Sequence, residues 1–159
     1  MRRSIGWVLL CLSLAAVPRA ARADFDGIVV EVEALRSDRG SVRVALYPET
    51  AWIEQGRELA TCHTNVHYGH ATCVLTDVRP GTYALAVLHD EDDDGGLDRD
   101  FLGLPQEGFG FSNDAAPGFG PPSFRDASFR FDGGEKDLVV HARYGLLRAH
   151  ASPQASRCS

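Results

Sequence analysis

The residues with the clearest chemical potential are the acidic side chains that follow His89. Counted from Asp90 as position 1, they match a calcium-binding loop in register. Carboxylates stand at positions 1, 3, 5 and 9 and a glycine at the sharp-turn position 6: Asp90, Asp92, Asp94, Asp98 and Gly95. Position 7, which contributes only a backbone carbonyl, is Gly96. Position 12 is Phe101 instead of the usual bidentate Glu, so the loop lacks its closing ligand.

We expect an acid outside the loop, Asp100 or Glu107, to complete the shell together with the Gly96 carbonyl. Seven carboxylates lie between Asp90 and Asp100 with Arg99 as the only opposite charge, and such a run repels itself unless it is screened. Hard oxygen ligands on a flexible loop favour calcium over zinc. The alternative is a solvated acidic turn without an ion.

The first residues predict export. A basic start, an apolar stretch from Ile5 to Val17 and the small residues before Asp24 form a secretory signal peptide over residues 1–23. The apolar stretch is too short to span a membrane, and no later segment approaches the roughly 20 apolar residues that a span needs. We therefore expect a periplasmic or secreted protein.

Charge and length limit the rest of the chain. Cleavage removes four of the 16 basic residues and none of the 22 acidic ones, which leaves a net charge of about −10. Such a surface disfavours nucleic acid and anionic lipid. We expect one domain over residues 24–146 and a polar tail over residues 147–159, and the sequence does not indicate an oligomeric state.

Three cysteines remain after cleavage. Cys62 and Cys73 flank a polar run, so in an oxidising compartment they could staple the two arms of a hairpin. A metal site is the rival, because His63, His67 and His70 lie between them, although this spacing matches no standard zinc pattern; free thiols are the third reading. Cys158 has no evident partner.

Alternation of apolar and polar residues predicts strands and few helices. An apolar run over residues 82–88 suits a central strand that is covered on both faces, and only residues 49–55 invite a helical turn. Further strands are expected around residues 28–33, 42–47, 58–64, 72–78, 127–131 and 138–144. About seven short strands predict an all-β antiparallel sandwich.

A long connection rich in Gly, Pro and Phe runs from Phe101 to Phe124. Loops of this length are usually functional or disordered, and the aromatic content argues against disorder. We expect it to present a binding surface that includes Phe109, Phe111, Ser112 and Asn113, while the alternative is that its rings cap one end of the sandwich.

The chain also resembles a known bacterial family. Residues 81–98, with the core His89-Asp90-Glu91, are followed by the blocks 102–105 and 107–113. Together they resemble domain-of-unknown-function family 2141, whose pattern runs through H-D-E-N-x-N-G-x-L-D, then L-G-x-P-x-E-G-F/Y-G-F-S-N. Asp92 and Asp94 stand where that family often carries Asn. The resemblance covers residues 27–144 and implies an exported transthyretin-like or prealbumin-like sandwich with Greek-key connections, but no activity.

Two function classes remain open. The first is a calcium-stabilised, non-catalytic module that binds a protein or glycan of the cell envelope through its long loop. The second is a metal-dependent hydrolase of envelope material, with His89 or Glu107 beside an open coordination position. The chain contains no G-x-S-x-G, H-E-x-x-H or glycine-rich phosphate loop, which favours the first class.

Overall fold

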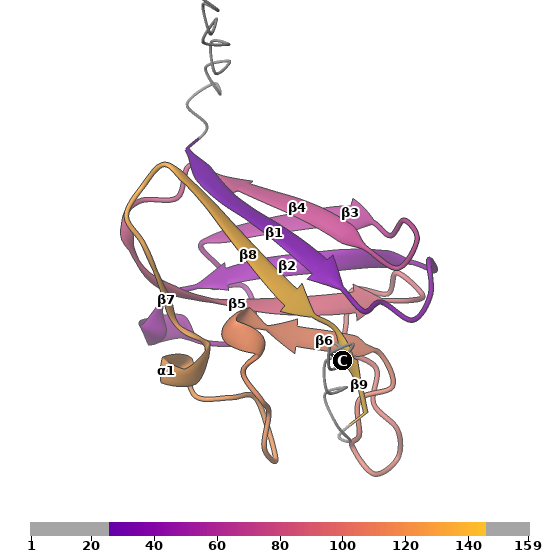
Figure 1. The fold of residues 1–159 in the computed structure, drawn as a ribbon. Coiled ribbons are helices and arrows are strands. Elements are labelled where there is room, and N and C mark those ends of the chain that lie inside the picture. The colour runs from indigo at the N-terminus through magenta and orange to yellow at the C-terminus, as the bar shows by residue number, and fades with distance from the viewer. Residues whose placement is uncertain (1–25, 146–159) are drawn as a thin grey trace, which may run out of the picture.

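The chain forms a β-sandwich, which the computed structural model describes for residues 26–145 (Figure 1). Short helical turns interrupt the loops: η1 (Glu49–Ala51), η2 (Ser112–Asp114) and α1 (Phe124–Ala127). The strands of the described part are β1 (Gly27–Glu33), β2 (Ser41–Tyr47), β3 (Ala60–Asn65), β4 (Ala71–Thr76), β5 (Gly81–Asp90), β6 (Gly108–Phe111), β7 (Phe129–Phe131), β8 (Glu135–His141) and β9 (Arg143–Tyr144).

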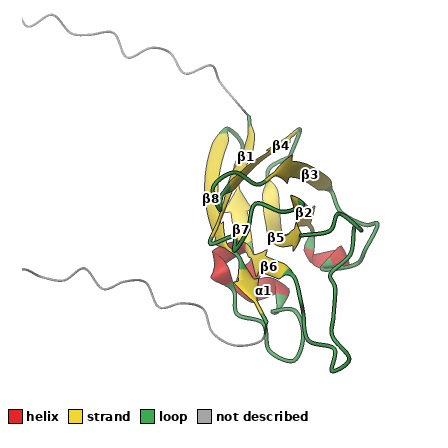
Figure 2. Cartoon of the chain, turned by 90° about the vertical axis from the view of Figure 1, so that its right-hand side faces the viewer, coloured by secondary structure: helices red, strands yellow, loops and turns green. Residues whose placement is uncertain are grey.

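The strands make two sheets. The smaller sheet has the order β4-β1-β8, and the larger one has the order β3-β2-β5-β6-β9, with β7 paired to the first residues of β5. All pairs are antiparallel except β1 with β8, which are parallel neighbours (Figure 1). The predicted all-β sandwich is confirmed. In the side view, the longer loops and the short helices gather below the strands (Figure 2).

The core lies between the sheets and follows from the period of two along each strand. On β1, alternate side chains point inward and are fully buried, while the residues between them are partly or fully exposed. β2 and β5 supply the facing layer in the same way. The inward residues of these three strands are Ile28, Val30, Val32, Val42, Val44, Leu46, Leu85 and Val87.

The outer face of the larger sheet is apolar as well. It carries a second cluster built on Ala84, Phe109 and Phe111, against which Trp52 and Phe124 pack. The smaller sheet does not cover this face, so the segments around η1, residues 95–105 and residues 115–124 have to do so. The prediction of a central strand over residues 82–88 is confirmed by the position of β5 between β2 and β6, whereas its outer face is covered only in part.

The structure corrects the sequence reading in two places. Residues 101–124 are not one long connection, because Gly108–Phe111 pair with β5 as strand β6. The expected strand over 138–144 is divided, because the chain leaves β1 after His141 and joins β6 as β9. A strand of four residues in a Gly-Phe repeat has no β-branched residue and little alternation of polarity, so nothing in its sequence marks it.

The disulfide between Cys62 and Cys73 is confirmed, with a Cα–Cα distance of 5.8 Å. Its role differs from the expected one, because its two cysteines do not join paired strands. Cys62 lies on β3 in the larger sheet and Cys73 on β4 in the smaller one, so the bond ties the two sheets together at one edge. It also removes both thiolates from the rival zinc reading.

Some expectations concern residues outside the described part. The signal peptide, Cys158 and the polar tail over 147–159 lie there. Within residues 26–145, no helix is long and apolar enough to cross a membrane.

Loss of the disulfide should lower the free energy of unfolding. The bond closes a loop with a sequence separation of 11 residues, for which the chain-entropy model gives roughly 3 kcal/mol. We expect the double variant Cys62→Ala/Cys73→Ala to show this loss in urea unfolding, and wild-type protein to show it on adding reductant. Equal unfolding midpoints with and without reductant would contradict the expectation.

Candidate metal centre

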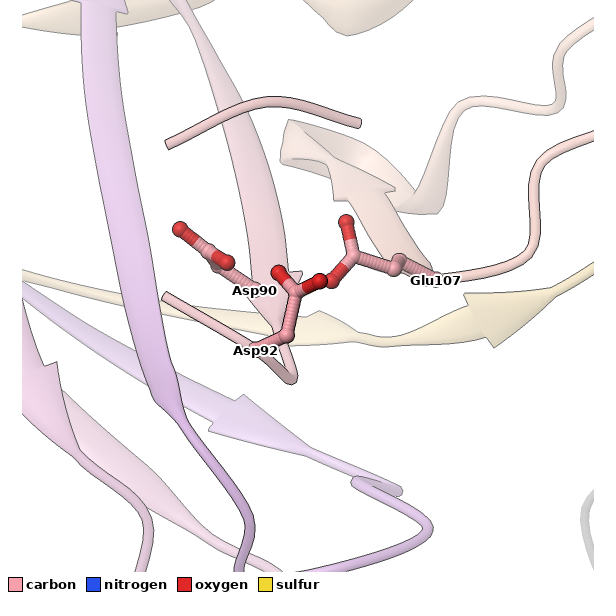
Figure 3. A group of neighbouring side chains, drawn as sticks. All are labelled: Asp90, Asp92 and Glu107. Atoms are coloured by element: carbon pink, nitrogen blue, oxygen red, sulfur yellow. The ribbon is translucent and has the colours of Figure 1, made fainter. Parts of the chain in front are cut away.

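Three carboxylates converge where β5 ends and β6 begins. One oxygen each from Asp90, Asp92 and Glu107 lies within 4.8 Å of the other two (Figure 3). β5 and β6 are antiparallel, with His89 opposite Gly108. The residue after His89 and the residue before Gly108 are therefore neighbours across the sheet, although 17 positions separate them in the chain.

Asp90 is the centre around which the loop is wound. Its side chain is fully buried, and its Oδ1 accepts the N–H of Asp94 at 3.1 Å. Its Oδ2 accepts the N–H of Gly95 at 2.9 Å and the Nε–H of Arg43 at 2.9 Å. A buried carboxylate needs such donors, and the loop and the neighbouring strand supply them.

Gly40 packs against the backbone of Asp90 from the opposite side. A Cβ on this glycine would lie 1.9 Å from the carbonyl oxygen of Asp90, and its φ of +64° is in the left-handed region. Only glycine fits both conditions without strain. The turn before β2 therefore holds the end of β5 in place.

Glu107 ties the two ends of the acidic loop together. Only 4 % of its surface is exposed. Its Oε1 accepts the N–H of Glu91 at 2.7 Å, and its Oε2 accepts the N–H of Asp98 at 3.1 Å. Glu107 thus reaches into the loop from outside. It is one of the two acids that the sequence suggested as the closing ligand.

The other acidic residues of the loop lie around the three-carboxylate group but are not part of it. Partial desolvation and the negative charges of Asp92, Asp94 and Asp90 raise the pKa of Asp98 above its usual value. Asp94 Oδ1 accepts the N–H of Gly96 at 2.7 Å. Like charges are therefore concentrated here, and the ligand role of the Gly96 carbonyl stays a prediction.

Asp100, the other candidate for closing the shell, is directed elsewhere. Its Oδ1 accepts the N–H groups of Leu102 and Leu104, each at 2.9 Å. The carboxylate thereby caps its own turn, and the structure does not bring it into the three-carboxylate group. Between the two candidates, geometry favours Glu107.

A second layer of contacts supports the loop and was not found from the sequence. Arg36 binds Glu91 through its Nε, with a distance of 3.0 Å to Oε2, and through its Nη2. Ser37 donates a hydroxyl hydrogen bond to the same carboxylate at 2.6 Å. Arg36 also lies over the ring of Tyr144, 4.4 Å from its centroid. These residues are distant in sequence and share no motif, so no local signal reveals them.

His89 lies beneath this layer and has no free ring nitrogen. Nε2 is 2.9 Å from the carbonyl oxygen of Arg39 and must donate to it. Nδ1 therefore accepts, and its partner is the Tyr144 hydroxyl at 2.6 Å. That hydroxyl in turn accepts the N–H of Arg36 at 3.0 Å. The histidine joins three segments of the fold and is fully buried.

The expected loop surface is corrected. Phe109 and Phe111 are 7 % and 8 % exposed, because both project from the outer face of strand β6 into the second cluster. Ser112 is buried, accepting the N–H of Leu85 and donating to the carbonyl of Ala127. Only Asn113 is exposed, and its amide donates to the carbonyls of Asp126 and Ser128. These residues make contacts that stabilise the fold, so they do not form an exposed binding surface.

The ion pair of Arg36 with Glu91 should make stability depend on pH. The hydrogen bond from Arg36, with that from Ser37, lowers the pKa of Glu91 from its ordinary 4.5 to about 2. Because the folded-state pKa is lowered, the stabilisation is present above about pH 4.5 and is lost as the pH falls toward 2. Arg36 is half exposed, so solvent reduces the effect to about 1–2 kcal/mol.

We expect Glu91→Gln to lower the free energy of unfolding by that amount at pH 6 and by much less at pH 2.5, as measured by urea unfolding. Glu54→Gln is the matched control, because Glu54 and its partner Arg57 are both more than half exposed. Such a pair contributes within about 0.5 kcal/mol. A loss for Glu91→Gln that is the same at both pH values would refute the assignment.

Comparisons with known proteins identify the family. No curated protein and no solved structure matches the chain. One family model matches residues 30–139, which include every residue of the candidate metal centre. Its description reads "Uncharacterized protein conserved in bacteria (DUF2141)", and because the match covers more than half of the sequence, the chain belongs to this family.

Proposed function

We propose that this protein is an exported, non-catalytic binding module of the bacterial cell envelope, whose loop end is stabilised by calcium. The observation that carries the proposal is the convergence of Asp90, Asp92 and Glu107. Two of these carboxylates are buried within a loop whose other acids are close enough to repel them. A divalent cation would turn that repulsion into attraction.

The donor set favours calcium over zinc. Carboxylate oxygens are the hard ligands that calcium prefers, whereas structural zinc sites use sulfur and nitrogen. The nearest imidazole, that of His89, has both nitrogens engaged in hydrogen bonds. Carboxylates from two separate segments also suit the variable coordination of calcium better than the near-ideal octahedron that magnesium demands.

Export is supported by the bond between Cys62 and Cys73. Disulfides persist in oxidising compartments such as the periplasm and are rare in the bacterial cytosol. The N-terminal signal pattern and the acidic mature charge agree with a periplasmic or secreted location.

The proposal that the protein is non-catalytic rests on the burial and hydrogen bonds of its best acid-base candidate. His89 is fully buried, and its ring joins Tyr144 to the carbonyl of Arg39. Both carboxylate oxygens of Glu107 accept hydrogen bonds from loop amides. Both side chains therefore have the contacts of structural residues, which weakens the hydrolase alternative.

A binding role is supported by apolar side chains on the loops near the acidic segment. Phe101 is 94 % exposed and Leu102 is 68 % exposed, and Phe119 is fully exposed. Large apolar groups that lie close together at a surface usually mark an interaction site. We propose that they meet an envelope protein or glycan; nucleic acid does not suit a chain of this charge.

Calcium should raise the melting temperature of the protein and bind with measurable heat. At 100 times the dissociation constant, the added stability would be roughly 2.7 kcal/mol. Differential scanning calorimetry in chelator and in millimolar calcium, together with titration calorimetry, measures both quantities. No heat of binding and identical melting curves would remove calcium from the proposal.

Matched variants assign the ligands. Asp92→Ala removes the side-chain oxygens of an exposed acid in the converging group and should abolish or strongly weaken the calcium shift, while Glu107→Gln, which loses one charge, should weaken it. Asp100→Asn is the control, because its side-chain oxygen can still accept the amides of Leu102 and Leu104. A calcium shift that disappears in the control but survives Asp92→Ala would place the ion elsewhere.

A further inference from the structure

A cleft of about 470 Å³ lies on the outer face of the larger sheet. Its floor consists of β2, β5 and β6, where Ala45 is opposite Ala86 and Ala86 is opposite Phe111. Both alanines have small side chains, so the floor recedes at this point. Its volume is within the range of small-molecule sites.

The covering loops are held by their own contacts. The indole N–H of Trp52 donates to the carbonyl of Pro122 at 2.8 Å. The Trp52 ring makes edge contacts with Phe111 and Phe124, with centroids 5.9 Å and 6.0 Å away. Residues 98–106 are fixed to each other by backbone bonds, including Gln106 N–H to the Asp98 carbonyl at 2.8 Å. These contacts fix the segments that form the walls of the cleft.

The walls are apolar, and the entrance is apolar too. Leu88, Leu97, Leu104, Pro105, Phe109 and Phe111 line the interior. Leu102 and Phe119, which are largely exposed, also line the cleft and so mark its mouth. A glycan requires many hydrogen-bonding partners, which these apolar side chains do not offer. An apolar chain would gain free energy from leaving water here.

The two ends of the cleft carry side chains of opposite charge. Arg43 and Arg99 line the cleft beside the acidic loop, whereas Tyr47 and Glu58 lie toward the opposite end. Tyr47 is four positions after Arg43 on β2, a span of about 13 Å. Backbone N–H groups, that of Gly56 among them, lower the pKa of Glu58, so this carboxylate is ionised and repels an anion. Among the residues that line the cleft, only the two arginines are cationic, so an anionic head group has its partners at that end, in competition with the carboxylates of the acidic loop beside it.

Arg43 retains donors for such a head group. Within the described residues, its guanidinium makes one hydrogen bond, from Nε to Asp90. Arginine carries five N–H donors, so its terminal nitrogens remain available. Arg99 donates through Nη1 to the carbonyl of Gly103, at 3.0 Å, and likewise keeps donors in reserve. Two guanidinium groups beside an apolar trough suit a carboxylate or phosphate joined to an acyl chain.

We propose that this cleft binds an elongated acyl chain with an anionic head, the head at Arg43 and Arg99 and the chain over Ala45 and Ala86. The assignment rests on the proposed binding role and names a lipid-like ligand for the cleft in place of a protein or glycan. It does not require calcium, because the floor belongs to the sheet, and the acidic loop that carries Leu97 and Arg99 is held by hydrogen bonds to Asp90 and Glu107.

The test uses the mature protein and two probes of equal length, dodecanoate and dodecanol. We expect dodecanoate to bind by titration calorimetry, to shift the NMR methyl signal of Ala45, and to bind about tenfold more tightly than dodecanol. Ala86→Leu, which fills the floor, should weaken dodecanoate binding at least tenfold. Arg99→Gln should reduce the preference for dodecanoate over dodecanol, while Arg130→Gln on β7 is the matched control and should leave it unchanged.

Other results decide against the proposal. Absence of binding by either probe, equal affinity for both, or affinity unchanged in folded Ala86→Leu would overturn it. Far-ultraviolet circular dichroism and melting curves establish that each variant is folded. Vesicles of phosphatidylglycerol identify the source of the chain: binding that Ala86→Leu abolishes assigns a membrane lipid, and binding of dodecanoate alone assigns a free acid.

Calorimetry in chelator and in calcium separates this proposal from the previous one. Dodecanoate binding in both conditions supports the cleft even when calcium shows no effect. A calcium-dependent melting shift without binding of either probe supports the metal centre and rejects the cleft ligand.

Discussion

The structure depends on the fact that β5 is apolar on both faces. Leu85 and Val87 point into the sandwich core, while Ala84, Ala86 and Leu88 face the other way. A sheet with two apolar faces must be covered twice. The smaller sheet covers one face completely. The other face is left to loops and short helices, and loops cannot interdigitate as regularly as a second sheet does. The cleft is a consequence of this incomplete cover.

The same strand determines where the acidic group forms. β5 ends at Asp90, so its last side chain is drawn into the fold instead of remaining in solvent. A buried carboxylate is costly unless donors surround it. Loop amides and Arg43 supply those donors on one side, and Glu107 organises the loop from the other. The loop is thus held by hydrogen bonds to negative groups that also repel one another.

Arg43 connects the two proposed sites. Its Nε donates to Asp90 in the acidic group, and its side chain lines the cleft on the other side. An ion bound near Asp90 and an anionic head group in the cleft would both act on the same guanidinium. Binding at one site can therefore move the Arg43 side chain at the other site. Such a shared group is the minimum requirement for coupling between sites.

The elements that could be predicted from the sequence are those with local patterns. The alternation in β1, β2 and β8, the apolar run of β5 and the spacing from Asp90 to Asp98 are all readable because neighbouring residues carry the signal. The pairing of Cys62 with Cys73 was readable as one of three alternatives, since the predicted export favours oxidation.

The folded structure, and no local pattern, determines which residues meet across the sheets. It selected Glu107 over Asp100, because β6 pairs with β5 and Asp100 caps its own turn. It buries Phe109 and Phe111 in the second cluster. The sequence could not predict this, because a Gly-Phe repeat carries no polar residue to show which face is solvated. It also brought Arg36, Arg43 and Tyr144 to the acidic loop. Such partners lie far apart in the chain, and strand order, which no local pattern encodes, is what places them together.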